Sequence, residues 1–229
     1  MVIAKLVTPS TVKYEGLSDF APISLVGTSP LVLVGKPDLP ASNAAELLKL
    51  LRAQPGKFNY ATSGIGTSLH LGGELVNQAA KVNMVHVPYK VGAQIVTDLA
   101  GNQIELAILP LVSAHQPARA GRIKAYGVLH PKRWPTAPEI PSLGEVADFK
   151  NVDVLVWFGL FAPAKTDANI IARLAKEMNV VLSDAEVVRR LEGLDLVPSK
   201  IPPAEFAVFL RREHDKFSAV VKAANIKAE

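Results

Sequence analysis

The sequence predicts an α/β fold in which a mostly parallel sheet is covered by helices on both faces. Short apolar runs of strand length alternate with helical patterns between residues 57 and 129. These runs are continuously apolar, which is typical of parallel strands whose two faces are both buried. The 229 residues are enough for one large domain or for two lobes with a core.

The elements before residue 57 are predicted from breakers and caps. Residues 20–26 and 31–36 are two apolar runs, and we expect two strands because Gly27-Thr28-Ser29-Pro30 lies between them. Asn43 and Glu46 form a capping-box pattern at the start of a helix that ends before Pro55-Gly56.

Strands and helices then alternate at short spacing. Strands are predicted at residues 57–61, 83–87, 104–109 and 123–129. Helices are predicted after the first three, beginning at Thr67, Ala93 and Leu111. Prolines between residues 131 and 141 indicate a stiff connector, and a short helix is expected around 142–147.

The last third of the chain is predicted to be mainly helical. A strand at 154–162 is followed by a helix that Thr166 would cap. Ser183 and Glu186 form a second capping box, residues 194–198 a short edge strand, and 203–225 a long final helix. The buried side of the helix after Thr166 is expected to contain Ile170, Ile171, Leu174, Met178, Val181 and Leu182.

Two changes in composition, near residues 28–30 and across 130–154, predict two lobes. Residues 1–32 with 155–229 would form the first lobe, and the inserted residues 33–154 the second, which carries the ligand loops. Two chain crossings between lobes form a hinge, and a cleft between lobes is a natural site for a small molecule.

The stretch from residue 59 to residue 74 is the strongest functional signal. A short strand leads through a Ser/Thr- and Gly-rich loop, 62–66, into a helix at Thr67. Such a loop collects unpaired N–H groups, hydroxyls and the positive end of a helix dipole, which suits a carboxylate or phosphate. A plain strand-to-helix connection capped by Thr67 is the alternative. Loops 88–92 and 109–113 are expected at the same edge of the sheet.

Composition and motifs exclude several function classes. The net charge of +4 is spread along the chain, which argues against nucleic-acid binding, and no apolar run is long enough to cross a bilayer. Without cysteine there is no thiolate chemistry, and the scattered histidines form no metal-spaced pair, so neither cofactor nor metal is expected. Gly64-Ile65-Gly66 fails as a dinucleotide motif because Leu69 occupies the third glycine position, and no catalytic nucleophile with a base is evident.

Eight runs in the chain resemble, in the same order, the substrate-binding proteins of tripartite tricarboxylate transporters, the Bug or TctC-like family. The most specific run is Ser63-Gly64-Ile65-Gly66-Thr67-Ser68-Leu69-His70-Leu71. The others are residues 17–23, 55–61, 84–90, 120–125, 132–133, 157–163 and 202–206. The resemblance implies a type II periplasmic-binding-protein fold, whose two lobes close on an organic acid like a Venus flytrap.

The resemblance also implies ligand contacts and partners. The carboxylate would be held by Ser63, Gly64, Gly66, Thr67 and Ser68, and by the loops that contain Tyr89, Lys90, Gly92, Leu109 and Pro110. His70 could approach the ligand, although core packing or a hydrogen bond to a neighbouring loop is the preferred interpretation. The implied protein is a periplasmic, monomeric, non-enzymatic receptor for membrane transporter subunits.

The sequence departs from the family pattern in two places. Family members usually begin with an export signal and a first segment of the first lobe, whereas this chain matches from roughly the end of that segment onward. No signal peptide is evident, so a cytoplasmic protein or a fragment is expected if the start is genuine. Leu109 and Pro110 replace an Asp-Asn pair that is frequent in the family, which favours a more apolar acid. A ligand-sensing effector-type domain and a truncated, non-functional paralogue stay as alternatives.

Overall fold

A computed structural model describes residues 2–227, and the chain divides into two compact units. Unit 1 consists of Met1–Ser29 and Trp157–Glu229, and unit 2 of Pro30–Val156. The α/β fold class is confirmed, although the sheet is mixed rather than mainly parallel. The expected closure of two lobes on a ligand stays a prediction.

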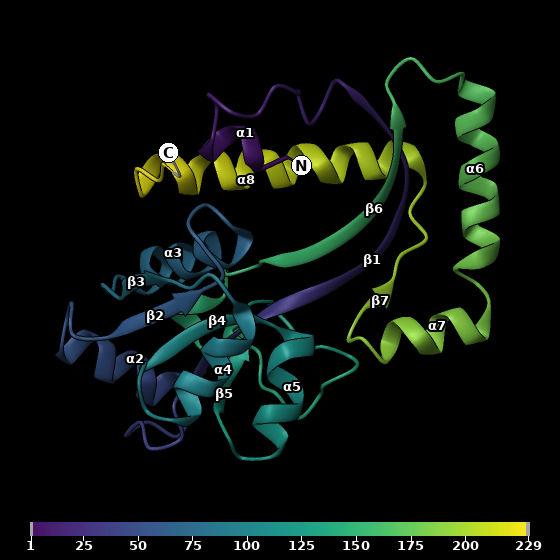
Figure 1. Ribbon diagram of the computed structural model, residues 1–229. Helices are drawn as coiled ribbons and strands as arrows, with labels where there is room; N and C mark the ends of the chain where they lie inside the picture. Colours follow the sequence, from purple (N-terminus) through teal and green to yellow (C-terminus); the bar gives the residue numbers. More distant parts are fainter. Residues whose placement is uncertain (1, 228–229) are drawn as a thin grey trace. The chain divides into compact units, whose positions relative to one another are not determined.

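Unit 2 contains a sheet with the strand order β3-β2-β4-β1-β5 (Figure 1). β2 runs parallel to both β3 and β4, whereas the end of β1 runs antiparallel to β4 and β5. Residues Leu31–Val34 of β1 are completely buried, as expected for a central strand. The strands are β1 (Phe20–Gly35), β2 (Asn59–Thr62), β3 (Val85–Pro88), β4 (Leu106–Pro110) and β5 (Lys124–Val128).

Helices cover both faces of this sheet. α3 connects β2 to β3 on one face, and α4 and α5 lie on the other (Figure 1). The Asn43 side chain accepts a hydrogen bond from the Glu46 N–H, which confirms the first predicted cap. The helices of unit 2 are α2 (Ala44–Ala53), α3 (Ser68–Ala80), α4 (Gly92–Ala100), α5 (Leu111–Arg119) and the 3-10 turns η1 (Leu143–Glu145) and η2 (Ala147–Phe149).

Unit 1 is built around the first part of β1, which pairs with β6 and β7. Trp157 and Phe161 of β6 contact Phe206 and Phe209 of α8, with ring centroids 5.2–6.1 Å apart. These aromatic contacts supply much of the core of the unit. Its further elements are α1 (Ala4–Val7), β6 (Leu155–Pro163), α6 (Ala168–Val181), α7 (Ala185–Glu192), β7 (Val197–Pro198) and α8 (Pro203–Ala223).

The predicted break between residues 26 and 31 is wrong, because β1 continues through it as one strand of 16 residues. Gly27 does not adopt a left-handed φ. A Cβ at Gly27 would lie 3.0 Å from the Val197 carbonyl oxygen, so the glycine allows β7 to approach. The breaker signal therefore marked close strand packing and not a turn.

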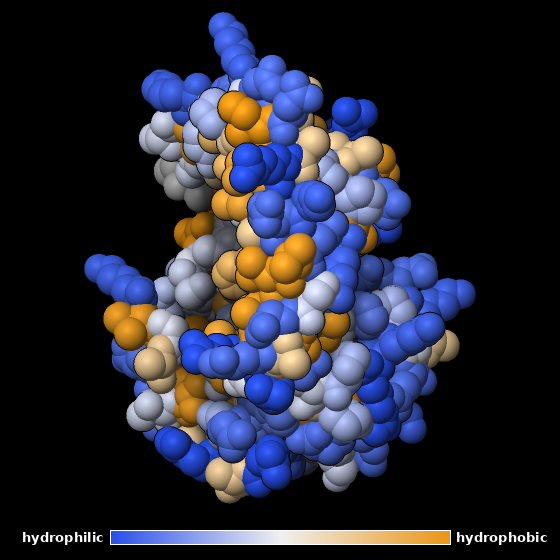
Figure 2. Space-filling view, turned by 90° about the vertical axis from the view of Figure 1, so that its right-hand side faces the viewer, coloured by the Kyte–Doolittle hydropathy of each residue, from blue (hydrophilic) through white to orange (hydrophobic). Residues whose placement is uncertain are grey.

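Three predictions around α6 and α7 are also corrected. Asp167 and Asp184 cap these helices in place of Thr166 and Ser183, since the aspartate carboxylates accept the first free N–H groups. Within α6 only Ala175 is buried, while Ile171 and Met178 are partly buried. Of the residues predicted on the buried side, Leu182 at the end of the helix is buried as expected. Figure 2, viewed from the side on which α6 lies, shows apolar side chains exposed among hydrophilic ones. The exposed fractions are 53% for Ile170, 38% for Leu174 and 46% for Val181.

Candidate functional site

The candidate site lies where the chain changes direction in the sheet of unit 2. From β2 the chain crosses to β3 on one side through α3, and from β3 it crosses back over β2 to β4 through α4. β2 and β4 are parallel neighbours, paired at Tyr60 with Leu106 and Ala61 with Ala107, so their carboxyl ends meet at one edge. Such a switch point leaves a crevice between the loops that follow the two strands.

A cavity of about 460 Å³ occupies this position. Ser63 follows β2, Gly92 begins α4, and Leu109 and Pro110 end β4, so residues from all three predicted loops line it. The other lining residues are Leu69, Ala93, Ile95, Val96, Thr97, Ser113 and Arg122. The cavity is therefore mainly apolar, with a few polar groups and one cation.

Internal hydrogen bonds define the shape of the glycine loop, residues 63–67. Thr67 Oγ1 donates to the Gly64 carbonyl at 2.9 Å and accepts from the His70 N–H at 3.3 Å, so Thr67 caps α3 as predicted. Thr62 Oγ1 accepts from the Gly64 N–H at 3.3 Å. Gly64 and Gly66 have φ values of +132° and +73°, which other residues rarely adopt. The loop is thus a specific turn, and its conformation requires these glycines.

These contacts decide which donors remain for an anion. Gly64 and Gly66 already donate their N–H groups within the loop region, to Thr62 Oγ1 and to His70 Nδ1. Within α3, the N–H groups of Ser68 and Leu69 come too early in the helix to have intrahelical acceptors. Among the described residues, none forms a hydrogen bond with the hydroxyls of Ser63 or Ser68. The free donors therefore lie at the first turn of α3 and beside the cavity.

Two other helices, α4 and α5, begin at the same edge of the sheet, and unlike α3 they have no side-chain cap. Val91 precedes α4 and Pro110 precedes α5, and neither has a side chain that accepts from the first helical N–H groups. Each helix N-terminus carries the positive end of the helix dipole. Three such ends beside one cavity favour an anionic ligand.

His70 is buried under the loop, in contact with His86 of β3. The two imidazole rings are stacked, with centroids 3.8 Å apart and planes inclined by 14°. His86 Nε2 lies 2.6 Å from Thr62 Oγ1. Burial lowers the pKa of His70 and, with the neighbouring His70, lowers the pKa of His86 to about 4. Both rings are therefore neutral at pH 7, and His70 contacts the loop and does not line the cavity.

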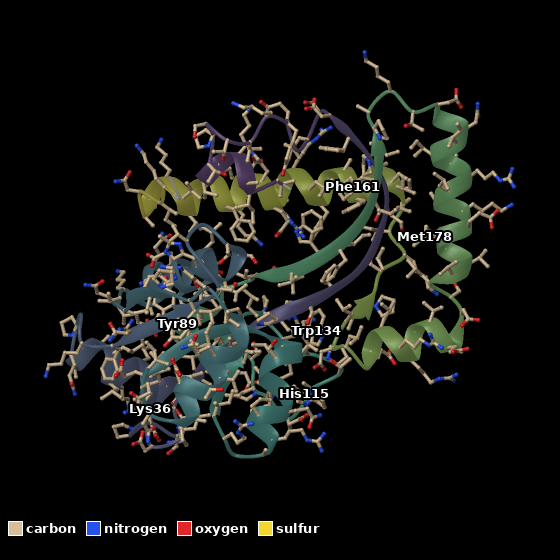
Figure 3. The ribbon with its side chains drawn as sticks, in the orientation of Figure 1. Lys36, Tyr89, His115, Trp134, Phe161 and Met178 are labelled. Atoms are coloured by element: carbon tan, nitrogen blue, oxygen red, sulfur yellow. The ribbon has the colours of Figure 1, made fainter. Side chains whose placement is uncertain are left out.

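The predicted residues Tyr89, labelled in Figure 3, and Lys90 follow β3. Neither lines the cavity. Tyr89 donates its hydroxyl to Asp98 of α4 at 2.9 Å, so this hydroxyl is already used. Burial, and then this hydrogen bond, raise the pKa of Tyr89. Lys90 is exposed. Their contribution to ligand binding stays a prediction.

Sequence reasoning missed the residues of the cavity that lie inside helices or beyond them. Ile95, Val96 and Thr97 are on the second turn of α4, where only the helical spacing could have pointed to them. Arg122 follows α5, and no motif or spacing in the sequence pointed to it as a site residue. It is the one charged residue of the cavity lining, and its guanidinium makes no ion pair with any described residue. It gives the cavity a positive potential.

No group of three His, Asp or Glu side chains within residues 2–227 is arranged to hold a metal ion. His115 on α5 (Figure 3) instead has its Nε2 atom 2.7 Å from Glu139 Oε1. In the same range, no helix combines the length and the apolar character that a membrane crossing requires.

Comparison with known proteins gives the family. The model of the tripartite tricarboxylate transporter family receptor, TctC, matches residues 3–226. The chain belongs to the TctC family. TctC proteins are periplasmic solute-binding proteins, which agrees with the resemblance in the sequence.

Individual TctC relatives extend the comparison. A protein encoded in the tcbD–tcbE intergenic region of Pseudomonas sp. (strain P51) is 33% identical over 217 residues, covering 95% of this chain and 65% of that protein. R. palustris Rpa4515, solved with adipate, is 26% identical with a TM-score of 0.83, covering 98% of this chain and 76% of that one. MatC from Rhodopseudomonas palustris, solved with malate, is 25% identical with a TM-score of 0.79, covering 96% and 76%. The chain thus spans slightly less than two thirds of the length of the curated relative.

Proposed function

We propose that this TctC-family chain binds a small organic acid at the loop edge of unit 2, for delivery to the membrane subunits of a tripartite tricarboxylate transporter. The observation that supports this most directly is the convergence of three helix N-termini on one cavity at the switch point of the sheet. A carboxylate there accepts hydrogen bonds from the free N–H groups of Ser68 and Leu69. Each such charge-assisted bond contributes about 1.5–3 kcal/mol.

The lining of the cavity suggests the character of the acid. Leu69, Ile95, Val96 and Leu109 offer apolar surface, and the Arg122 side chain adds a cation. Two relatives were solved with the carboxylic acids adipate and malate. We infer a ligand with a carboxylate for the α3 terminus and a largely apolar chain for the cavity.

The protein acts in this proposal as a receptor without catalysis. The site offers hydrogen-bond donors, apolar surface and one guanidinium, which suffice for reversible capture. A monomer in the periplasm is the form that we expect from the family. The proposal predicts no metal requirement for binding.

A thermal-shift panel tests the proposal. The chain would be melted with dicarboxylates, tricarboxylates, aromatic acids and amino acids, each at several concentrations. We expect one acid class to raise the melting temperature in proportion to the logarithm of its concentration, because a ligand that binds only the native state stabilises it by mass action. A cooperative melt with no shift from any acid, or steady turnover of an acid, would overturn the proposal.

Thr67→Val tests the location of the site. Valine has nearly the shape of threonine but loses both the cap of α3 and the bond to the Gly64 carbonyl. We expect affinity for the acid found in the panel to fall by about tenfold or more, equivalent to about 1.4 kcal/mol, in a calorimetric titration. Thr8→Val is the matched control, since the Thr8 hydroxyl bonds Ala4 within unit 1. Unchanged affinity in Thr67→Val would remove Thr67 from the site.

A further inference from the structure

The stacked histidines under the glycine loop come from different elements. His70 lies on the first turn of α3, and His86 lies on β3, opposite Tyr60 in the parallel pairing of β2 with β3. The ring of Tyr60 lies beside this stack, tilted by 36° to the His86 ring with the centroids 5.1 Å apart. Buried Tyr60 and His70 and partly buried His86 thus form a layer of three rings beneath the loop.

Both histidines bond atoms that shape the loop. His70 Nδ1 accepts the Gly66 N–H at 3.1 Å, so Nδ1 carries no proton and the ring proton is on Nε2. His86 Nε2 shares a 2.6 Å hydrogen bond with Thr62 Oγ1, and the same hydroxyl accepts the Gly64 N–H. The two glycines of the loop are therefore each tied, directly or through Thr62, to one of the two imidazoles.

We propose that His70 and His86 are positioning residues that hold the glycine loop in its anion-accepting shape and do so only as an uncharged pair. The inference rests on the proposed function, because it assigns these residues to the architecture of that site. A proton on His70 Nδ1 removes the acceptor for Gly66. A second proton on His86 places two like charges in rings stacked 3.8 Å apart.

The surroundings of the pair favour the uncharged state. Glu74, on the next turn of α3, is the nearest carboxylate, but it accepts the Tyr60 hydroxyl at 2.6 Å. Tyr60 on β2 is a neutral phenol, and burial raises its pKa further. Asp148 on η2, which α3 also contacts, is paired with Arg52. Burial outweighs the attraction of Glu74 and lowers the pKa of His70.

The inference is tested by nuclear magnetic resonance on the isotopically labelled full chain without ligand. Long-range nitrogen–proton spectra should show His70 with an unprotonated Nδ1 and a proton on Nε2. The Gly66 amide signal should move on acidification with the same midpoint as His70. If Nδ1 of His70 carries the proton at neutral pH, the inference is wrong.

Three variants separate positioning from simple packing. In His70→Asn the Asn Oδ1 replaces Nδ1 as acceptor but does not titrate, so the Gly66 amide should stay near its native position at all pH values. In His70→Ala the acceptor is lost, and Gly66 should exchange its amide proton faster. His214→Asn, the same change in unit 1, should leave Gly66 and its titration unaltered. Equal behaviour of Gly66 in the asparagine and alanine variants at position 70 would contradict the inference.

Binding provides an independent readout, with adipate and malate as probes. If either acid binds the native chain, affinity should decrease by about tenfold or more in His70→Ala and stay within about threefold in His70→Asn. In His70→Asn the affinity should keep only the pH dependence that comes from protonation of the acid's own carboxyl groups. Unchanged affinity in His70→Ala would refute the positioning role. If neither acid binds the native chain, that result counts against the proposed function, while the behaviour of Gly66 still decides the inference.

Discussion

Gly73 on α3 is the position where one added methyl group should do the most damage to the layer beneath the site. A Cβ there would lie 2.1, 2.5 and 2.9 Å from Cε2, Cζ and Cδ2 of Tyr60, whose ring is completely buried. The ring would have to shift by more than 1 Å to restore normal contact, and its 2.6 Å bond to Glu74 would be strained. Overpacking lowers stability by about 1–3 kcal/mol, and loss of the hydrogen bond to the carboxylate lowers it by about 1.5–3 kcal/mol. The higher helix propensity of alanine compared with glycine raises stability by about 1 kcal/mol. We therefore expect Gly73→Ala to lower the free energy of unfolding by about 1.5–5 kcal/mol.

The neighbouring glycine in the same helix supplies the matched control. A Cβ at Gly72 would meet the methyl ends of Leu129 and Leu31 at 3.2 Å and of Ile108 at 3.7 Å, and side-chain ends can move by a few tenths of an ångström. Gly72→Ala has the same propensity gain, so its stability should stay within about 1 kcal/mol of the native chain. Urea denaturation followed by circular dichroism measures both variants. Equal unfolding midpoints for the two variants would refute the reasoning.

Three further changes test the cavity, the end of α3 and the histidine pair. Arg122→Gln should weaken acid binding by calorimetry because the cavity loses its cation, whereas Arg119→Gln, outside this cavity, should not. Asn77→Ala should lower the free energy of unfolding by about 2–3 kcal/mol, because the buried Asn77 amide bonds both the N–H and the carbonyl of Met84, at 3.0 and 3.1 Å. Urea denaturation measures this, and an unchanged unfolding midpoint would contradict it. His86 has a folded pKa of about 4 against 6.5 unfolded, so the unfolded chain binds the proton first and stability falls as the pH decreases from 7 to 5. About 2 kcal/mol of that fall should be absent in His86→Gln, and an identical fall in both proteins would be evidence against a buried neutral His86.

Local sequence predicted the capped helix starts to within one residue. Asn43 and Thr67 cap as expected, and Ser42, which precedes Asn43, is not used as the cap. At Thr166 and Asp167 the aspartate is used, one residue after the predicted cap. Both residue types can accept the free N–H groups, so the backbone path into the helix makes the choice.

Tertiary contact explains what sequence could not predict. The helical spacing of Ile170, Leu174 and Val181 predicts an apolar side for α6 correctly, but spacing contains no information on whether another element covers that side. Similarly, Gly27 was interpreted as a turn residue although its function is to admit the Val197 carbonyl. Periodicity and breakers describe the local chain, whereas burial depends on partners that are distant in sequence.

The same distinction applies to the candidate site. The Ser63–Ser68 motif located the glycine loop, and the natural inference was that all of its N–H groups face a ligand. In the structure His70 takes the Gly66 N–H, and His86 reaches the loop only through the parallel register that places it opposite Tyr60. A motif therefore marks where an anion can bind, but residues on a neighbouring strand determine which donors are left for it. For this chain the Gly64 and Gly66 donors are used and those of Ser68 and Leu69 are left, so we expect the carboxylate to lie against the first turn of α3.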